Sequence, residues 1–328
     1  MLARKEPKMD VSVVIPSYNN QATIADVLDA LLNQKYNKGQ TEIIVIDDHS
    51  TDNTKQIIKK YPITKICNGK NLGLAKSLNK GISLAKHQII VTLHADTIPN
   101  NQKWLEQLVA PLTDHNVAAV CSLQIPPNSQ RRQLTIWEKM LYTKLGPHNA
   151  LNDKADAYKR TVLDEIGLFD DKTFRTAGED EDLALRLRFH EKNIRGSQAQ
   201  VTHNHYFYTG QHKTSIFRQI LKKEYTFGKA GGALRRKYPR YRPGSYIFPI
   251  SKPFTSDGLF RVVLCIGALI PYVQLAFIPL LIGAASIGIT NLATENKKLL
   301  ILYPFFNILR FATYTIGYIA GIVKGKQT

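Results

Sequence analysis

The stretch Glu42-Ile43-Ile44-Val45-Ile46-Asp47-Asp48-His49-Ser50-Thr51-Asp52 changes abruptly from apolar to polar residues. Its first part, 42–46, predicts a strand buried on both faces, because branched apolar side chains follow one another without polar alternation. Residues 52–60 then have the spacing of a helix, with Thr51 or Asp52 as its cap. A buried strand that leads directly into a helix is typical of a parallel α/β sheet.

The same alternation continues on both sides of this stretch. Strands are predicted at 11–15, where Pro16 ends the run, and at 88–93, and helices at 21–32 and 74–85. The fold class is therefore α/β, with ligands of nucleotide size expected at the carboxyl ends of the strands. No GxGxxG or Walker A run is present, which argues against a dinucleotide enzyme and a P-loop NTPase.

Length and cysteine content narrow the class of protein further. The chain has 328 residues, enough for one large or two ordinary domains, and a formal net charge of +18. Its three cysteines are far apart and form no CxxC pair, so we expect neither a disulfide framework nor a zinc site. The first ten residues have no apolar core, so no cleaved signal peptide is expected.

The C-terminal part is much more apolar. Residues 262–289 contain no charge, and residues 299–323 contain only Arg310. Both stretches are long enough to cross a hydrocarbon core of ~30 Å, so we predict a membrane domain at 261–328 with two transmembrane helices. Pro271 and Pro279 leave a re-entrant hairpin open for the first stretch.

A basic segment precedes this apolar part. Ten lysines and arginines lie between Lys213 and Arg242, opposed by Glu224 alone, and apolar residues recur there at helical spacing. We predict that residues 211–260 form an amphipathic platform on anionic lipid headgroups, with the catalytic domain, 1–210, on the cytoplasmic side of the membrane. No nucleic-acid motif accompanies the segment, so nucleic acid is not an expected partner.

Four consecutive acids, Glu179-Asp180-Glu181-Asp182, follow Gly178 in this basic chain. The residues after them, 183–188, predict a helix, and acids on the first turn of a helix are favoured by its macrodipole. The acids could equally face a metal ion or a sugar hydroxyl. The four acids by themselves do not decide between a helix N-terminus and a ligand site.

Polar residues also follow three predicted strands. They lie at 16–19, 47–52 and 94–96, the carboxyl ends at which such sheets bind ligands. A carboxylate beside a diphosphate suits Mg²⁺ or Mn²⁺, although each residue taken singly could be a turn or cap residue.

Six segments in this order resemble the family 2 glycosyltransferases of the GT-A fold: VSVVIPSYNN, EIIVIDDHSTDNT, NLGLAKSLNKGI, VTLHADTIP, YKRTVLDEIGLFDD and GEDEDLALRLR. The resemblance covers residues 11–208, and the tail looks like that of the membrane-anchored members. It implies a GT-A, Rossmann-like domain with a mixed, mostly parallel sheet. It also implies inverting transfer of a sugar from a nucleotide-diphosphate donor, with a divalent cation, Mg²⁺ or Mn²⁺, as cofactor.

Site residues follow from the resemblance by position. Asp180 matches the general base, and Asp96 matches the metal-binding Asp of the DxD motif. Glu179 and Asp182 would support the site or bind the acceptor, and Arg186 has the spacing to pair with Asp182. The donor would be bound by residues of the first four motifs, namely Pro16, Tyr18, Asp48, Asn71, Gly73, Lys76 and Asp96. Asp48 would lie nearest the nucleobase, and the motif with Asn71, Gly73 and Lys76 would pass near the diphosphate.

The chain departs from the family pattern at His94, which replaces the first Asp of DxD. Asp96 alone could carry the metal contact, while His94 could bond to the nucleotide. His203 and His205 are spaced like paired ligands on one face of a strand, although histidines with a structural role are favoured there.

The sequence thus predicts a multi-pass membrane glycosyltransferase that acts on an acceptor hydroxyl, with a lipid-linked glycan as the expected acceptor. A polyprenyl-phosphate glycosyltransferase is an alternative, but an anionic acceptor would need no base. A processive synthase is disfavoured, because two spans are few and no QxxRW-type motif is present. From a different class, a catalytically silent scaffold that binds nucleotide sugar remains open, with His94 as its motivation.

Overall fold

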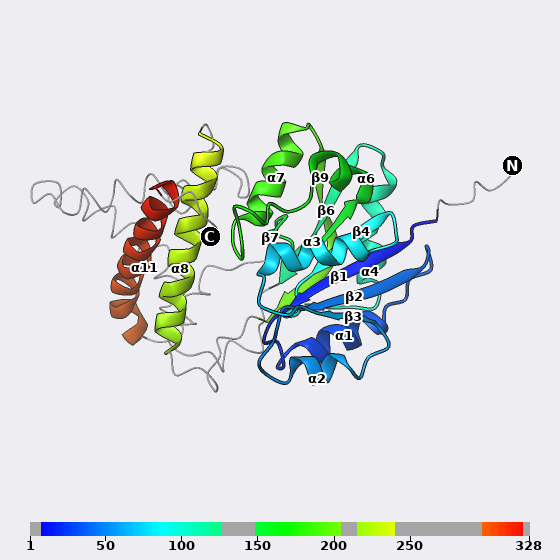
Figure 1. The fold of residues 1–328 in the computed structure, drawn as a ribbon, viewed down its shortest axis with the longest axis horizontal. Coiled ribbons are helices and arrows are strands. Elements are labelled where there is room, and N and C mark those ends of the chain that lie inside the picture. The colour runs from blue at the N-terminus through cyan, green and yellow to red at the C-terminus, as the bar shows by residue number, and fades with distance from the viewer. Residues whose placement is uncertain (1–7, 126–147, 205–214, 240–296, 324–328) are drawn as a thin grey trace, which may run out of the picture. The chain divides into compact units, whose positions relative to one another are not determined.

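A computed structural model describes residues 8–125, 148–204, 215–239 and 297–323 (Figure 1). Its contacts divide the chain into two compact units. The first comprises Met1–Pro127 with Pro147–Tyr206, and the second comprises Asn128–Gly146 with Phe207–Thr328. The first unit contains the sheet and all the predicted site residues, and the second contains two long helices.

The first unit alternates strands and helices as the sequence predicts, and adds strands that it does not predict. In chain order its elements are β1 (Val11–Ser17), α1 (Ile24–Leu32), β2 (Thr41–Asp47), α2 (Thr54–Ile58), β3 (Thr64–Cys67), α3 (Leu74–Leu84), β4 (Ile89–Leu93), β5 (Thr97–Pro99), α4 (Trp104–Val109), a 3-10 turn (Ala110–Thr113), β6 (Val117–Ile125), β7 (His148–Asn149), β8 (Ala155–Lys159), α6 (Arg160–Ile166), α7 (Glu179–Phe189) and β9 (Asn193–His203).

The strands form one mixed sheet in the order β3-β2-β1-β4-β8-β6-β9-β5, with β7 beside β6. The strands predicted from sequence, β1, β2 and β4, lie together and run parallel, and β3 extends them. The remaining half is largely antiparallel, with β8 between β4 and β6. A mixed sheet is therefore confirmed. The expectation that it is mostly parallel holds for one half only, because half of the pairings among the described strands are antiparallel.

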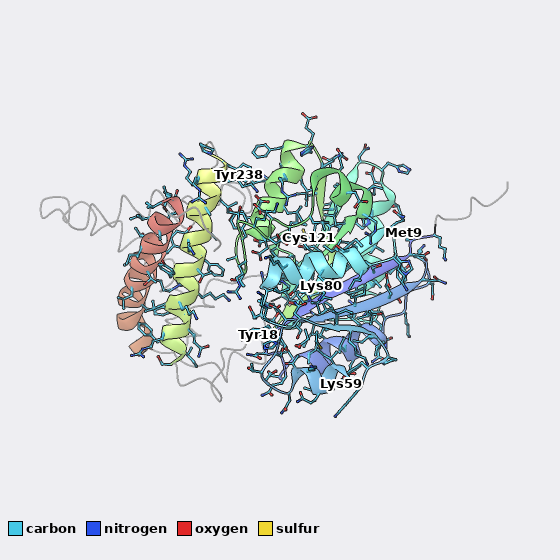
Figure 2. All side chains as sticks on the ribbon, in the orientation of Figure 1. Met9, Tyr18, Lys59, Lys80, Cys121 and Tyr238 are labelled. Carbon is cyan, nitrogen blue, oxygen red and sulfur yellow. The ribbon has the colours of Figure 1, made fainter. Side chains whose placement is uncertain are left out.

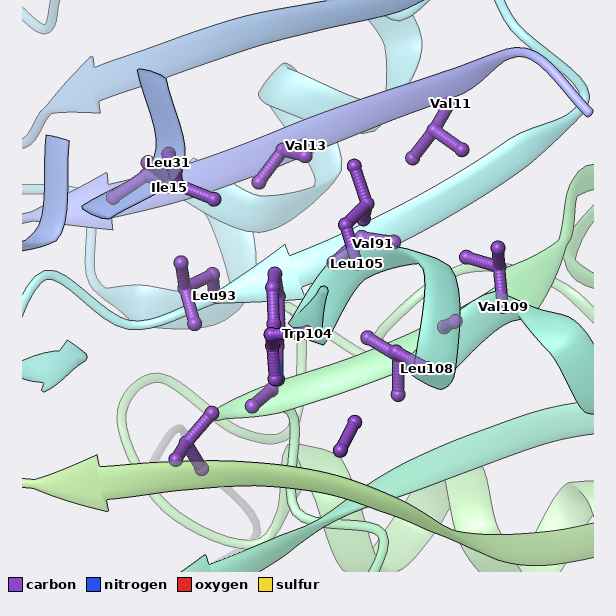
Figure 3. Packing of buried hydrophobic residues seen from close by; sticks show 14 of the residues in the cluster. Val11, Val13, Ile15, Leu31, Val91, Leu93, Trp104, Leu105, Leu108 and Val109 are labelled. Carbon is purple, nitrogen blue, oxygen red and sulfur yellow. The ribbon is translucent and has the colours of Figure 1, made fainter. Parts of the chain in front are cut away.

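Helices cover both faces of this sheet. On β1, Val11, Val13 and Ile15 face one hydrophobic cluster, which includes residues of α1 and α4. Val14 points to the opposite face and packs with residues of α3, α6 and α7, as the alternation of side chains along a strand requires. Figure 3 shows Trp104, Leu105 and Leu108 of α4 near Val91 and Leu93 of the sheet. Because both faces are covered, β1 is buried along its whole length.

The second unit contains α8 (Ile216–Lys237) and α11 (Lys297–Val323), which lie side by side (Figure 1). The helices are in backbone contact through glycines: a Cβ atom at Gly228 would lie 2.0 Å from the Tyr314 carbonyl oxygen, and one at Gly317 would lie 2.2 Å from that of Tyr225. Arg310 donates to Glu224 across this contact, with Nε 2.6 Å from Oε1. Arg310 therefore faces protein.

The predicted membrane domain is tested only in part by this structure. The first predicted span, 262–289, lies outside the described residues. The second, 299–323, coincides with α11 and is helical as expected. Among the residues that the structure describes, no helix meets the length and hydropathy needed to cross a membrane.

Candidate active site

The loops after β1 and β2 are joined to each other by side-chain hydrogen bonds. Asn19 is central: its N–H donates to Ser50 Oγ over 2.9 Å, and its Oδ1 accepts the N–H of Thr51 over 2.8 Å. Asn19 adopts a φ of 55°, a left-handed conformation that Asn tolerates better than most residues. The polar ends of these neighbouring strands are thus fixed against each other before any ligand binds.

Asp48 is buried and organises the next loop. Its Oδ1 accepts the side-chain N–H of Asn68 and the backbone N–H of Leu72, and its Oδ2 accepts the N–H of Gly73, each over 2.8 Å. A carboxylate offers about four acceptor positions, so one position remains for a ligand. The arrangement therefore links the residue expected at the nucleobase to the loop expected at the diphosphate.

Arg175 joins this loop to the segment before α7, and no sequence motif indicates this contact. Its guanidinium donates to Asn71 Oδ1 over 2.6 Å, and its backbone carbonyl accepts the N–H of Ala75 at the start of α3. Gly73 has a φ of 95°, and a Cβ atom there would lie 2.3 Å from Arg175 Cγ. An exposed cation thus lies beside the predicted diphosphate loop.

The end of β4 brings Asp96 next to His203. Because β5 pairs with β9, Thr97 lies opposite His203, and the Asn204 N–H donates to the Asp96 carbonyl over 2.7 Å. The His203 Nε2 atom lies 3.3 Å from Asp96 Oδ2. His203 therefore lies beside Asp96, the predicted metal ligand, whereas His205 lies outside the described residues.

His94 contacts a buried carboxylate that the sequence analysis missed. Its Nε2 atom lies 2.8 Å from Oδ1 of Asp153, in the turn before β8. Burial raises the pKa of Asp153 well above its usual range, with Asp180 and Asp96 as further causes. Within β8, burial raises the pKa of Asp156 to about 8. Two further acids thus lie near the site.

The four acids 179–182 occupy the first turn of α7, as predicted. The helix follows Gly178, whose φ of 90° suits glycine. Glu179 is buried, and its pKa is raised well above the usual range by burial and then by the charges of Asp153 and Asp180. Asp182 is fully buried and accepts from Arg186 Nε over 2.9 Å, the pair expected from their spacing. Asp180, which lies between Glu179 and Asp182 in the sequence, is half-buried.

The remaining predicted donor residues lie along the same edge of the sheet. Pro16 is buried within β1, while Tyr18 is 47% exposed just after it (Figure 2). Lys76 lies in the first turn of α3, next to Gly73. The predicted residues therefore lie at the carboxyl ends of β1, β2 and β4, between β3 and the first turn of α3, and at the start of α7.

A metal ion fits the donor atoms at Asp96. Within the described residues, no group of three or more His, Cys, Asp or Glu side chains is arranged to hold an ion. A catalytic Mg²⁺ commonly uses one or two carboxylates together with substrate phosphates, and imidazole nitrogen is a further acceptable ligand type for transition metals. The Asp96 carboxylate with His203 beside it meets this limited requirement.

Comparisons with known proteins agree with this fold. A family model described as glycosyl transferase family 2 matches residues 12–163. The putative glycosyltransferase EpsE of Bacillus subtilis is 30% identical over 204 residues, which are 58% of this chain and 70% of EpsE. This chain therefore belongs to glycosyl transferase family 2.

Two other similar proteins differ more. The beta-monoglucosyldiacylglycerol synthase of Nostoc is 28% identical over 202 residues, 56% of this chain and 42% of that protein. The chain spans about half the length of several curated relatives that it matches. The crystal structure of a mannosyltransferase from Pyrobaculum calidifontis, in complex with GDP-Man and Mn²⁺, has a TM-score of 0.59 at 19% identity and covers 98% of this chain and 88% of its own. At this level of identity, the likeness supports the fold alone.

Proposed function

We propose that this chain transfers a sugar from a nucleotide-diphosphate donor to an acceptor hydroxyl, with inversion at the anomeric carbon and Asp180 as the general base. The observation that carries the proposal is the meeting of two groups at one edge of the sheet: Asp96 at the end of β4, and the acids at the start of α7. Their proximity is supported by Asp153, which lies 2.8 Å from His94, two residues before Asp96, and whose pKa is raised first by burial and then by the charges of Asp180 and Asp96.

Inversion requires a single in-line displacement. The acceptor oxygen forms a bond to the anomeric carbon as the bond from that carbon to the diphosphate oxygen breaks. Asp180 takes the proton of the acceptor hydroxyl as charge develops on its oxygen, a contribution of about 10²–10⁴-fold. A divalent cation at Asp96 would neutralise charge on the departing diphosphate.

The other acids at the site have distinct roles in this mechanism. Burial raises the pKa of Glu179 well above its usual range, which disfavours a second negative charge beside Asp180. The diphosphate is expected near Arg175, Asn71 and Lys76, because the cations would offset its charge and Asn71 is already held by Arg175. Asp48 keeps this loop in place.

We further propose that the acceptor is lipid-linked and that the catalytic unit works at the cytoplasmic face of a membrane. The basic residues of α8 and the two apolar stretches in the sequence support this. A relative named as a beta-monoglucosyldiacylglycerol synthase is consistent with a lipid acceptor.

The test begins with a screen of UDP-, GDP- and dTDP-sugars for hydrolysis and transfer that depend on a divalent cation. With the active donor, Asp180→Asn should lower kcat by about 10²–10⁴-fold and leave nucleotide affinity unchanged. Asp164→Asn, an exposed acid on α6, serves as the matched control and should retain wild-type turnover. A wild-type chain that binds nucleotide but turns over no donor would instead support a silent scaffold.

A further inference from the structure

The His94 backbone and side chain are both fixed by one turn, the turn that precedes β8. Its N–H donates to the Lys154 carbonyl over 2.9 Å, and its Nε2 atom lies 2.8 Å from Asp153 Oδ1. The antiparallel register of β4 and β8, with Leu93 opposite Ala155, brings the two segments together. The position of the imidazole therefore depends on residues 153–154.

This turn holds Asp153 in a conformation that is unfavourable for most residues. Its φ is 57°, in the left-handed region, which is unfavourable for most L-residues. Asp156 stabilises the turn, because its Oδ2 accepts the N–H groups of Asn152 and Asp153 over 2.7 and 2.6 Å. Backbone strain of this kind is concentrated at functional sites.

The two side chains differ in their access to a ligand. The Asp153 side chain is 2% exposed, whereas that of His94 is 17% exposed. Asp153 Oδ2 is buried and has no hydrogen-bond partner among the described residues. An unpaired carboxylate oxygen in the interior is costly, so its retention needs a reason beyond stability. Of the two side chains, that of His94 therefore has the greater access to a bound ligand.

We propose that Asp153 is a positioning residue that orients the His94 imidazole toward the ribose and phosphate groups of the bound nucleotide donor. His94 lies two residues before Asp96, at the same strand end, which places it at the donor's polar part. In the DxD pattern, position 94 would be an aspartate. Here it is His94, whose imidazole contacts the Asp153 carboxylate. This inference rests on the proposed function.

The experiment is a double-mutant cycle that measures nucleotide binding. His94→Ala, Asp153→Gly and the double variant are compared with wild type in calorimetric titrations with UDP and GDP in the presence of Mn²⁺. Glycine accepts a φ of 57°, so Asp153→Gly removes the carboxylate without straining the turn. Each single variant should bind about tenfold more weakly, and the double variant no more weakly than either, because the two residues act as a unit.

A conservative variant separates positioning from mere packing. Asn also tolerates the left-handed conformation and keeps a polar side chain of the same size beside His94 Nε2, so Asp153→Asn should regain most of the lost affinity. In turnover assays of Asp153→Gly the loss should appear in the KM for the donor more than in kcat. Asp114→Asn breaks an ion pair with Arg195 at the other end of β6 and serves as the matched control, with wild-type affinity expected.

The outcomes that overturn the inference are distinct. Wild-type nucleotide affinity in Asp153→Gly overturns this inference but leaves the proposed function standing. The same holds if the fold losses of the two single variants multiply in the double variant. A wild-type chain that binds neither UDP nor GDP overturns the proposed function and this inference together.

Discussion

Three acids of the first unit have pKa values above their usual range. Burial is the main cause for Asp153, Asp156 and Glu179, and mutual repulsion among neighbouring carboxylates adds to it for Asp153 and Glu179. Raised pKa values lower the electrostatic cost of bringing the diphosphate of the proposed donor close to these acids.

Asp156 gives a pH-dependent stability that can be measured. Its pKa is raised to about 8, so between pH ~4 and pH 8 the folded chain holds a proton that the unfolded chain has lost. Stability must then fall as pH rises through this window, by up to about 1.4 kcal/mol per pH unit. Asp156→Asn can still accept the two N–H groups and should show a flatter profile from pH 5 to 8 in chemical unfolding. Parallel profiles for the two proteins would contradict the prediction.

Single residues differed in how far the sequence could identify them. Asp180, Asp96 and Asp48 were found because they belong to motifs, and their positions at strand and helix ends agree with that interpretation. Asp153 and Arg175 belong to loops without a motif, and they come near the site only when β8 pairs with β4 and the segment before α7 meets α3. Sequence spacing cannot show such contacts.

At the scale of elements, Asp182 and Arg186 fasten α7 to the end of α6. Arg186 donates to Asp182 and also to the carbonyl groups of Ile166, Gly167 and Leu168. Removing one partner of a buried ion pair leaves an uncompensated charge.

Asp182→Ala should therefore lower the free energy of unfolding by about 3–5 kcal/mol in a denaturant titration. The control is Glu165→Ala, which breaks an exposed pair with Lys192 at 2.7 Å and should cost about 0–1 kcal/mol. Equal losses of unfolding free energy in the two variants would show that the buried pair stabilises the fold no more than the exposed pair does.

The helix pair of the second unit has so little space that a single methyl group should separate its members. A Cβ atom at Gly317 would lie 2.2 Å from the Tyr225 carbonyl oxygen, whereas one at Gly69 would meet nothing within 4 Å. Gly317→Ala should thus reduce hydrogen-exchange protection in α8 and α11 in the full chain, at a cost of about 1–3 kcal/mol. Gly69→Ala is the matched control, and unchanged protection in Gly317→Ala would contradict this packing.

Elements were predictable where their pattern was local. Strands β1, β2 and β4 are continuous apolar runs, so they were found, and so were α1, α2 and α3 between them. Strand β9 contains alternating polar residues and Gly196, and β8 is a short run of five residues. These strands depend on pairing with distant partners, which is why the antiparallel half of the sheet was missed.

At the scale of the whole molecule, the net charge of +18 is distributed unevenly, and helix α8 carries a large share of the basic residues. Arg218 and Lys222 are exposed and one turn apart on that helix. A positive charge near an anionic membrane surface contributes about 1 kcal/mol to binding, so the proposed membrane platform makes a quantitative prediction.

The full chain should co-sediment with vesicles that contain anionic phospholipid, and higher salt should weaken the binding because the attraction is screened. Replacing Arg218 and Lys222 together with Gln should lower the affinity by about 25-fold, the product of two contributions of ~1 kcal/mol. Lys55 and Lys59, exposed and equally spaced at α2, form the matched pair. Their replacement changes the net charge by the same amount and should have little effect. Equal losses for the two pairs would mean that binding follows total charge, and the platform on α8 would have to be abandoned.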